Sequence, residues 1–344
     1  MRDPPRWFRG SLRRAYRVAL LEFQNTQSAA SWKLFELIPR LLLRRTRAQG
    51  KAGRKELETR MDSVLRGDWD MLLQEARRSA HQGPARRRSA PDDDSTLRRE
   101  RACTLVRLGE VSRARQALTS PALALGNEAT LRELQDPALR PPALTEELPE
   151  EAMSLRPETP LQLDNNFLIR ALRGARRGSA PGLSGTRAEH LKVLLEDEHT
   201  WDLFSQLANA YARGEVPEDI AAGLSMGRLT ALSKPGGRVR GIVTGATFRR
   251  VVARAMAMQF SKRFEEAAAP YQFALSTRAG ADAVAHALRA LSEQNPDVVI
   301  LSLDGIGAYD HVKRAAMLRK LGTEALHSLL PYVRMTYARQ SCYL

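Results

Sequence analysis

The sequence contains few cysteines, few aromatic residues and no long apolar run. Its two cysteines, Cys103 and Cys342, form no disulfide framework and no metal-ligand spacing, so we expect a reducing compartment. No stretch of about 18 apolar residues occurs, which argues against a membrane-spanning helix. Hydrophobic residues make up 43% of the 344 residues, enough for a sizeable core, although aromatic residues account for only 6%. These features favour an intracellular protein, nuclear or cytoplasmic, with one large domain or two ordinary ones.

Positive charge is concentrated near the start of the chain. The formal net charge is +15, and residues 1–120 hold 27 Lys and Arg against 14 Asp and Glu. Residues 121–200 hold 9 against 13, and residues 201–344 hold 18 against 12. A basic segment fits a polyanion such as RNA, DNA or an anionic membrane surface, and we expect a nucleic acid rather than a membrane. The alternative is a solvated, partly disordered basic arm that has no partner.

Residues 1–118 are predicted to form a basic helical region. Apolar positions recur at roughly helical spacing from Leu12 to Leu43, with a break expected at Pro39. Residues 80–100 combine proline, glycine, serine and opposed charge blocks, a composition typical of a disordered loop. A further helix is expected from Thr96 to Leu118.

Residues 119–165 are predicted to be a linker, because residues 119–162 hold seven prolines together with acidic pairs. Residues 166–344 are denser and more regular. Within them, the segment RLTALSKPGGRVRGIV predicts a strand-turn-strand hairpin, since Pro-Gly-Gly separates two alternating runs. The expected helices are Phe167–Arg176, Arg187–Glu196, Trp201–Arg213, Ala246–Phe264 and Gly280–Leu291.

The segment VVILSLDGIGAYDHVKR, residues 298–314, predicts a buried strand that ends on a carboxylate. Residues 298–303 are mostly branched and apolar, and Asp304 follows them directly. A carboxylate held at the end of a strand and followed by a tight turn can bind Mg²⁺, while nearby amides accept phosphate. The alternative is that Asp304 caps the helix beginning near Val312, a role that Asp310 fills better.

Four segments in the second half of the chain form an ordered series of motifs. They are SAPGLSGTRAEHLKVLL (179–195), LTALSKPGGRVRGIVTGATFRRVVARAMA (229–257), YQFALSTRAGADAVAHALRAL (271–291) and LSLDGIGAYDHVKRAAMLRKL (301–321). This series resembles the reverse transcriptases of non-long-terminal-repeat (LINE-like) retrotransposons. The first segment is similar to their A-P-G-x-D/S-G loop, the second to the fingers hairpin K-P-x-G-x-x-R-P-I, the third to Q-F-G…G-x-x-x-A, and the fourth to the first palm motif, L-D-x-x-x-A-F-D-x-V.

The resemblance implies roles for single residues. Asp304 corresponds to the first aspartate that binds catalytic Mg²⁺, and the amides around Ile306 and Gly307 are expected to lie along the incoming deoxynucleoside triphosphate. Tyr309 corresponds to the aromatic beneath the nucleotide sugar, where a 2′-hydroxyl would clash. Lys234 and Arg240 flank the hairpin turn where the family's cations bind the triphosphate. The alternatives are an ordinary core aromatic for Tyr309 and solvated surface cations for the hairpin pair.

The sequence departs from the family pattern in three places. Gly241 replaces the proline that usually follows Arg240, and Gly-Ile-Gly follows Asp304 in place of bulkier residues. The third departure is that the second metal-binding motif of the family, aromatic-x-Asp-Asp, is missing: no Asp-Asp pair occurs after Asp94. Polymerase chemistry needs several carboxylates to bind two metal ions, so we expect Mg²⁺ binding to be weak or absent.

The expected fold is therefore α+β: a mostly helical basic N-terminal region, then the fingers and incomplete palm of a right-hand polymerase fold over residues 166–344. We interpret the chain as a truncated or degenerate retrotransposon reverse transcriptase. Its expected partners are an RNA and DNA template-primer and deoxynucleoside triphosphates, without polymerisation by this chain alone. One alternative is a basic RNA-binding module joined to a relic polymerase portion, and another is a helical scaffolding protein.

Overall fold

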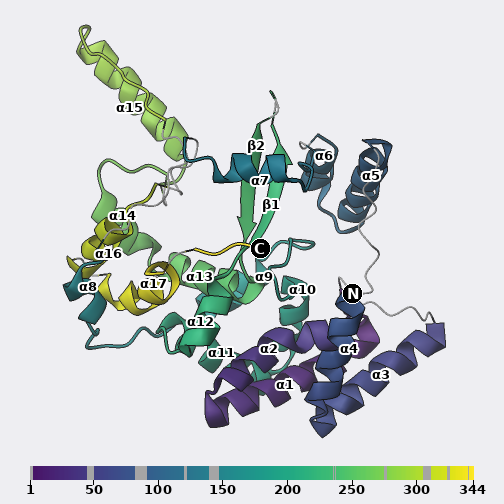
Figure 1. Cartoon of the computed structure of the whole chain (residues 1–344). Helices are drawn as coiled ribbons and strands as arrows, with labels where there is room; N and C mark the ends of the chain where they lie inside the picture. The colour runs from purple at the N-terminus through teal and green to yellow at the C-terminus, as the bar shows by residue number, and fades with distance from the viewer. Residues whose placement is uncertain are drawn as a thin grey trace.

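The computed structural model shows a mostly helical chain that has, in the parts it describes, one small antiparallel sheet (Figure 1). At this coarse level the α+β expectation is confirmed. The described residues are 3–44, 50–81, 91–119, 122–138, 147–234, 236, 238–274, 277–304, 311–323, 326–339 and 341–344.

Eight α-helices are described before residue 160, and the remaining elements follow. The first set is α1 (Arg9–Thr26), α2 (Ala29–Leu42), α3 (Gly50–Arg66), α4 (Trp69–His81), α5 (Pro91–Arg107), α6 (Val111–Thr119), α7 (Glu128–Gln135) and α8 (Glu150–Ser154). The second set is α9 (Asn165–Arg173), α10 (Ala188–Leu191), α11 (Glu198–Ala212), α12 (Glu218–Ser225), β1 (Arg228–Ser233), β2 (Val239–Thr244), α13 (Thr247–Gln259), α14 (Ser261–Ala268), α15 (Gly280–Gln294), α16 (Arg314–Thr323) and α17 (Leu330–Tyr337). Short 3-10 turns are η1 (Arg6–Phe8), η2 (Lys192–Glu196) and η4 (His327–Leu329).

The first two helices meet at a sharp corner. Gln27 has a left-handed backbone with φ of 47°, and the Ser28 side chain then accepts a hydrogen bond from Ser31 N at 3.2 Å to cap α2. The expected break at Pro39 is wrong, because α2 continues through this residue to Leu42. Pro39 is buried among apolar neighbours and lies within one turn of the helix end, so its packing offsets the single backbone bond that it cannot make.

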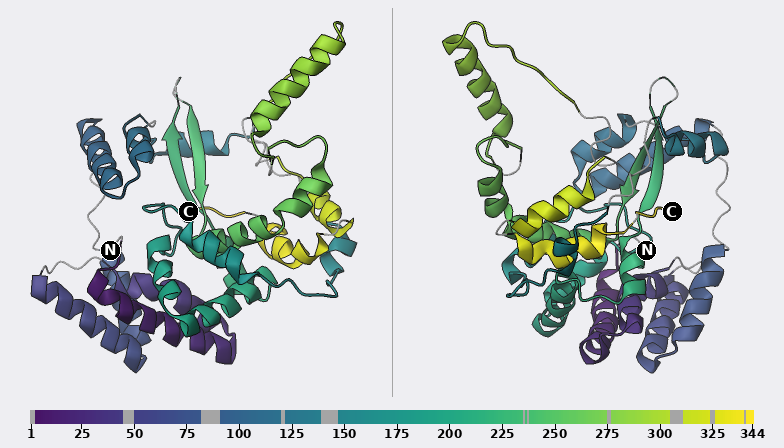
Figure 2. Two further views of the ribbon diagram at one scale, coloured as in Figure 1. Left: turned by 180° about the vertical axis from the view of Figure 1, so that it is seen from behind. Right: turned by 60° about the vertical axis from the view of Figure 1, so that its left-hand side comes forward.

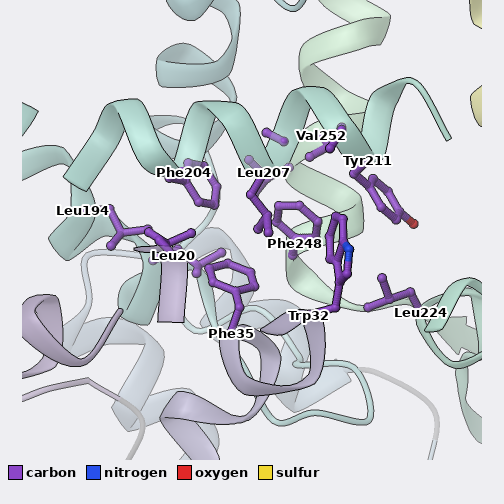
Figure 3. Packing of buried hydrophobic residues seen from close by; sticks show 14 of the residues in the cluster. Leu20, Trp32, Phe35, Leu194, Phe204, Leu207, Tyr211, Leu224, Phe248 and Val252 are labelled. Carbon is purple, nitrogen blue, oxygen red and sulfur yellow. The ribbon is translucent and has the colours of Figure 1, made fainter. Parts of the chain in front are cut away.

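The core joins the start of the chain to its middle. Trp32 and Phe35 of α2 pack against Phe204 and Tyr211 of α11 and Phe248 of α13 (Figure 3). The ring centroids of Phe35 and Phe248 are 5.3 Å apart, and those of Tyr211 and Phe248 are 5.2 Å apart. The Phe35 and Phe248 rings meet edge to face, an arrangement that adds to the free energy gained by burying the rings. The N-terminal helices and the second half of the chain therefore share one hydrophobic core.

Ion pairs also join α1 to the residues just before α11. Arg13 Nη1 lies 2.9 Å from Glu196 Oε2, and Arg17 Nη2 lies 2.5 Å from Asp197 Oδ1. Arg17 Nε also donates to Thr200 Oγ1 at 3.0 Å. Two cations of the basic N-terminal region are thus already paired with carboxylates of the later chain.

Most of the expected helices are present, but three of them are divided. The helix expected over Arg187–Glu196 is the short α10 followed by the 3-10 turn η2. The segment expected as one helix from Thr96 to Leu118 is α5 followed by α6, with Gly109 at φ of 77° between them. Residues 91–100, expected as loop, belong to α5, and residues 82–90 lie outside the described residues. The helix expected over Ala246–Phe264 is likewise divided at Phe260 into α13 and α14.

The expected buried strand over residues 298–303 is wrong. This segment has no regular structure, and the exposed fractions of Val299, Leu301 and Leu303 are 80%, 79% and 91%. A strand needs a neighbouring backbone for its hydrogen bonds, and no described strand lies beside this segment. It follows α15, which projects away from the rest of the molecule in each view (Figure 2).

Candidate nucleic-acid interface

The β1–β2 hairpin carries its cations on one face. Side chains alternate between the two faces of a strand, and directly paired residues point to the same side. Leu232 pairs with Arg240, so Arg240 shares a face with Lys234, two residues beyond Leu232. Lys234 N donates to Arg238 O at 2.6 Å, which sets Arg238 opposite Lys234 on that face. Lys234, Arg238 and Arg240 are all exposed, so three positive charges gather near the hairpin tip.

Two of these three cations have no acidic partner among the residues that the structure describes. Arg238 Nε lies 3.5 Å from Glu133 Oε1. The side chains of Lys234 and Arg240 make no hydrogen bond or ion pair with any residue that the structure describes. Both are therefore available to an anion from outside the chain.

Helix α7 covers the opposite face of the hairpin (Figure 1). A Cβ added at Gly241 would lie 3.2 Å from Leu229 Cδ1 and 3.3 Å from Leu134 Cδ2 of α7. Glu133 of the same helix accepts a hydrogen bond from Val239 N at 2.6 Å. The absence of a side chain at Gly241 thus leaves room for α7, which packs against this face of the hairpin.

Short extended segments bind the other edge of β1. Ser233 N donates to Ala122 O at 2.8 Å, and Leu229 N donates to Leu344 O at 2.7 Å. Both ends of the strand therefore have backbone partners besides β2. These contacts fix the hairpin and leave its cationic face open.

A second group of cations surrounds residues 173–180, which comprise the last residue of α9 and the loop after it. Side chains from α6, α13 and the region around α10 donate to successive carbonyls of this loop. The donors are Lys192 Nζ to Arg173 O and Ala175 O (3.0 and 2.9 Å), Arg254 Nη1 to Gly174 O (2.9 Å), Arg113 Nη1 to Arg177 O (2.7 Å), Arg187 Nη1 to Ser179 O (2.9 Å) and Arg250 Nη2 to Ala180 O (2.7 Å).

The loop adds exposed arginines of its own. Arg173 and Arg176 are exposed and pair with no carboxylate among the described residues, whereas Arg177 Nη2 lies 3.4 Å from Asp3 Oδ2. A guanidinium has five N–H donors, and Arg254 directs only one nitrogen at the loop. Burial lowers the pKa of Arg250, as expected for a cation partly removed from water. This loop, which we call the arginine loop, is strongly positive.

The arginine loop adjoins the base of the hairpin. A Cβ added at Gly182, just beyond the loop, would lie 2.7 Å from Ala246 Cα. Ala246 lies between the end of β2 and the start of α13. Only a glycine permits this close approach of the two backbones.

Of the residues expected at the metal site, the structure describes Asp304 alone. Asp304 is exposed, lies outside any strand or helix, and makes no hydrogen bond or ion pair with a described residue. Ile306, Gly307 and Tyr309 lie outside the described residues. Of the expected site residues that the structure describes, Lys234 and Arg240 share one face of the hairpin, and Asp304 forms an ion pair with neither.

Mg²⁺ has no fitting donor set in the described part of the chain. No three His, Cys, Asp or Glu side chains converge there. Mg²⁺ in phosphoryl-transfer sites is bound through carboxylates together with substrate phosphates, and the two-metal arrangement needs more than one carboxylate. Asp304 by itself does not meet that requirement.

The cations around the arginine loop were not predicted from the sequence. They come from separate segments, and only the fold brings their side chains to the same carbonyls. The available signal was the segment RGARRGSAPG (173–182), in which three arginines alternate with glycine and other small residues.

Comparisons with known proteins identify no family for this chain. Neither a scan against protein-family models nor a search of curated protein sequences gives a match. Among the described residues, no helix combines the length and apolar character that crossing a membrane requires.

Proposed function

We propose that this chain is a nucleic-acid-binding protein of reverse transcriptase ancestry, and that the cationic face of the β1–β2 hairpin contacts the phosphate backbone. The observation that carries this proposal is the exposure of Lys234 and Arg240 on one face without a carboxylate partner. Phosphate oxygens are suitable acceptors for both, because a guanidinium binds two oxygens at once and an ammonium acts as a point charge. The arginine loop adds positive charge at the base of the hairpin.

The ancestry part of the proposal is supported by the order of the four motifs along the sequence. Under this proposal, Lys234 and Arg240 derive from triphosphate-binding cations, and the chain retains weak deoxynucleotide binding. Asp304 derives from a Mg²⁺ ligand and Tyr309 from the residue beneath the sugar. Because one aspartate does not support two-metal transfer, the chain is proposed to bind nucleic acid without extending a primer.

The alternative, in which residues 1–118 alone bind RNA, receives less support. Arg13 and Arg17 of this region are paired with Glu196 and Asp197, and the guanidinium of Arg60 donates to backbone carbonyls inside the N-terminal helices. Cations engaged within the protein contribute little to counterion release.

Salt-dependent RNA binding tests the proposal. Replacing Lys234 and Arg240 with glutamine removes two phosphate contacts, so the slope of log K against log salt concentration is expected to fall by about 1 to 2. The measurement is fluorescence anisotropy of a short unstructured RNA over a series of salt concentrations.

The matched control is the pair Lys262→Gln and Arg319→Gln, exposed residues of α14 and α16 that change the net charge equally. These changes are expected to leave the slope close to that of the unmodified chain. A slope that is the same in the hairpin and control variants would contradict a phosphate-binding hairpin.

A further inference from the structure

A pocket of about 580 Å³ lies where the segment after α8 meets the α11–α12 turn and helix α17. This volume is in the range of small-molecule binding sites. Helices α8 and α17 lie together on the side of the molecule away from α5 and α6 (Figures 1 and 2). The proposed nucleic-acid surface uses none of the residues that line the pocket.

One part of the pocket wall is apolar. Its lining includes Met153, Pro157, Leu161, Pro331 and Met335. The proline rings are stiff, whereas methionine side chains adapt to the shape of whatever packs against them. This wall suits the apolar body of a small molecule.

Two of the four arginines in the lining are neutralised by glutamates. Arg213 Nε and Nη2 donate to the two carboxylate oxygens of Glu215, each at 2.7 Å, in a bidentate ion pair. Arg339 pairs with Glu218. These two pairs leave no net charge.

The other two arginines, Arg156 and Arg334, have no carboxylate partner among the described residues. Arg334 Nη1 donates to the carbonyls of Ala152, Met153 and Leu155 at 3.0, 2.8 and 2.6 Å. Arg156 Nη1 donates to the Met153 and Leu155 carbonyls at 3.5 and 3.4 Å. The Nε and Nη2 groups of both arginines donate to no described atom.

The two guanidinium groups are therefore held close to each other by one turn of carbonyls. Burial and, after it, the charge of Arg156 lower the pKa of Arg334. Two neighbouring like charges beside an apolar wall are stabilised by an anion placed between them.

We propose that this pocket binds a small organic anion, with its carboxylate or phosphate head between Arg156 and Arg334 and its apolar body against Pro331 and Met335. The free Nε and Nη2 groups supply donors to the oxygens of the head. The apolar wall selects a ligand with a hydrocarbon or aromatic body over a bare inorganic anion.

Calorimetric titration of the full chain tests this site. The probes are phenyl phosphate and benzoate, which differ in head group, together with inorganic phosphate and benzyl alcohol, which supply the head or the body alone. Phenyl phosphate or benzoate is expected to bind more tightly than either partial probe. Equal binding of inorganic phosphate and phenyl phosphate, or no binding of any probe, would overturn the proposal.

Two variants locate the binding. Arg156→Gln removes one charge without altering the carbonyl contacts of Arg334, and is expected to weaken the better probe about tenfold, the loss of one charge-assisted hydrogen bond. Ala338→Phe fills the pocket while it retains every arginine, and this variant is expected to abolish binding. Arg319→Gln on α16, outside the pocket, is the charge-matched control and is expected to bind normally.

The hairpin variant with glutamine at positions 234 and 240 separates this site from the nucleic-acid surface. It is expected to bind the better probe as the unmodified chain does, whatever its affinity for RNA. Probe binding that is lost in the hairpin variant and kept in Arg156→Gln would place the anion on the hairpin and refute the pocket.

Discussion

Glu36 is a buried carboxylic acid, and its surroundings disfavour the ionised form. It lies on α2, buried beside Tyr16, and its two carboxylate oxygens accept no hydrogen bond of normal geometry from described residues. Burial raises its pKa from 4.5 to about 7, and the nearby Ser184 hydroxyl offsets part of this rise. The folded chain therefore binds a proton at Glu36 between pH 4.5 and 7 that the unfolded chain does not.

Replacing Glu36 with glutamine is expected to make stability less dependent on pH. Because the folded-state pKa is raised, the unmodified chain loses stability as the pH rises from about 4.5 to about 7, by up to ~3 kcal/mol. Glu36→Gln is therefore expected to be more stable than the unmodified chain at pH 8 and similar at pH 5. Urea unfolding at both pH values measures the difference.

The exposed Glu22 of α1 provides a control with the same change of charge. If Glu36→Gln and Glu22→Gln shift the pH dependence of stability equally, Glu36 is not the group responsible. The sequence does not show that Glu36 is buried, because the segment WKLFELIP fits an amphipathic helix with Glu36 on either the buried or the exposed face. Its carboxylate lies beside Tyr16 of α1 and Ser184, and Ser184 comes much later in the chain.

The elements themselves were largely predictable where local chemistry decides them. The hairpin is confirmed over residues 228–244, because Pro-Gly-Gly and two alternating runs specify a turn and a register within one segment. Helices α9, α11 and α15 are also confirmed, near the expected bounds. The strand predicted over residues 298–303 is absent from the structure. A strand is stabilised by neighbouring strands from elsewhere in the chain, and the composition of the segment itself does not reveal whether such neighbours exist.

The close approach between the arginine loop and α13 is an element-scale feature that glycine permits. A Cβ at Gly182 would lie within 3 Å of the Ala246 backbone, so Gly182→Ala must displace one of the two segments. We expect a loss of about 1 to 3 kcal/mol, the usual range for overpacking a close contact. Thermal unfolding followed by circular dichroism measures it.

Gly223→Ala is the matched control, because Gly223 is exposed within α12 and an added Cβ there meets nothing within 4 Å. Alanine is favoured over glycine in a helix, so this change is expected to stabilise the chain by about 0.5 to 1 kcal/mol. A Gly182→Ala variant as stable as Gly223→Ala would show that the loop and α13 are not in tight contact.

At the scale of the whole molecule, the basic N-terminal helices form part of the hydrophobic core. Trp32 and Phe35 contribute to the same cluster as Phe204 and Phe248 (Figure 3). The charge pattern of the sequence predicted a basic region but could not show that some of its cations pair with residues more than 180 positions away. Deleting this region to test RNA binding would therefore disrupt folding, and point variants of the hairpin give the clearer result.

A chain that begins at Gly50 is expected to lose its cooperative thermal transition, because removing α1 and α2 exposes the aromatic side chains of α11 and α13 to water. The full chain with Trp32→Ala is expected to lose about 3 to 5 kcal/mol, whereas Trp7→Ala, at a half-exposed tryptophan of η1, loses much less. Differential scanning calorimetry compares the three. A shortened chain that unfolds cooperatively at the temperature of the full chain would mean that residues 50–344 contain a complete core and that α1 and α2 only cover it.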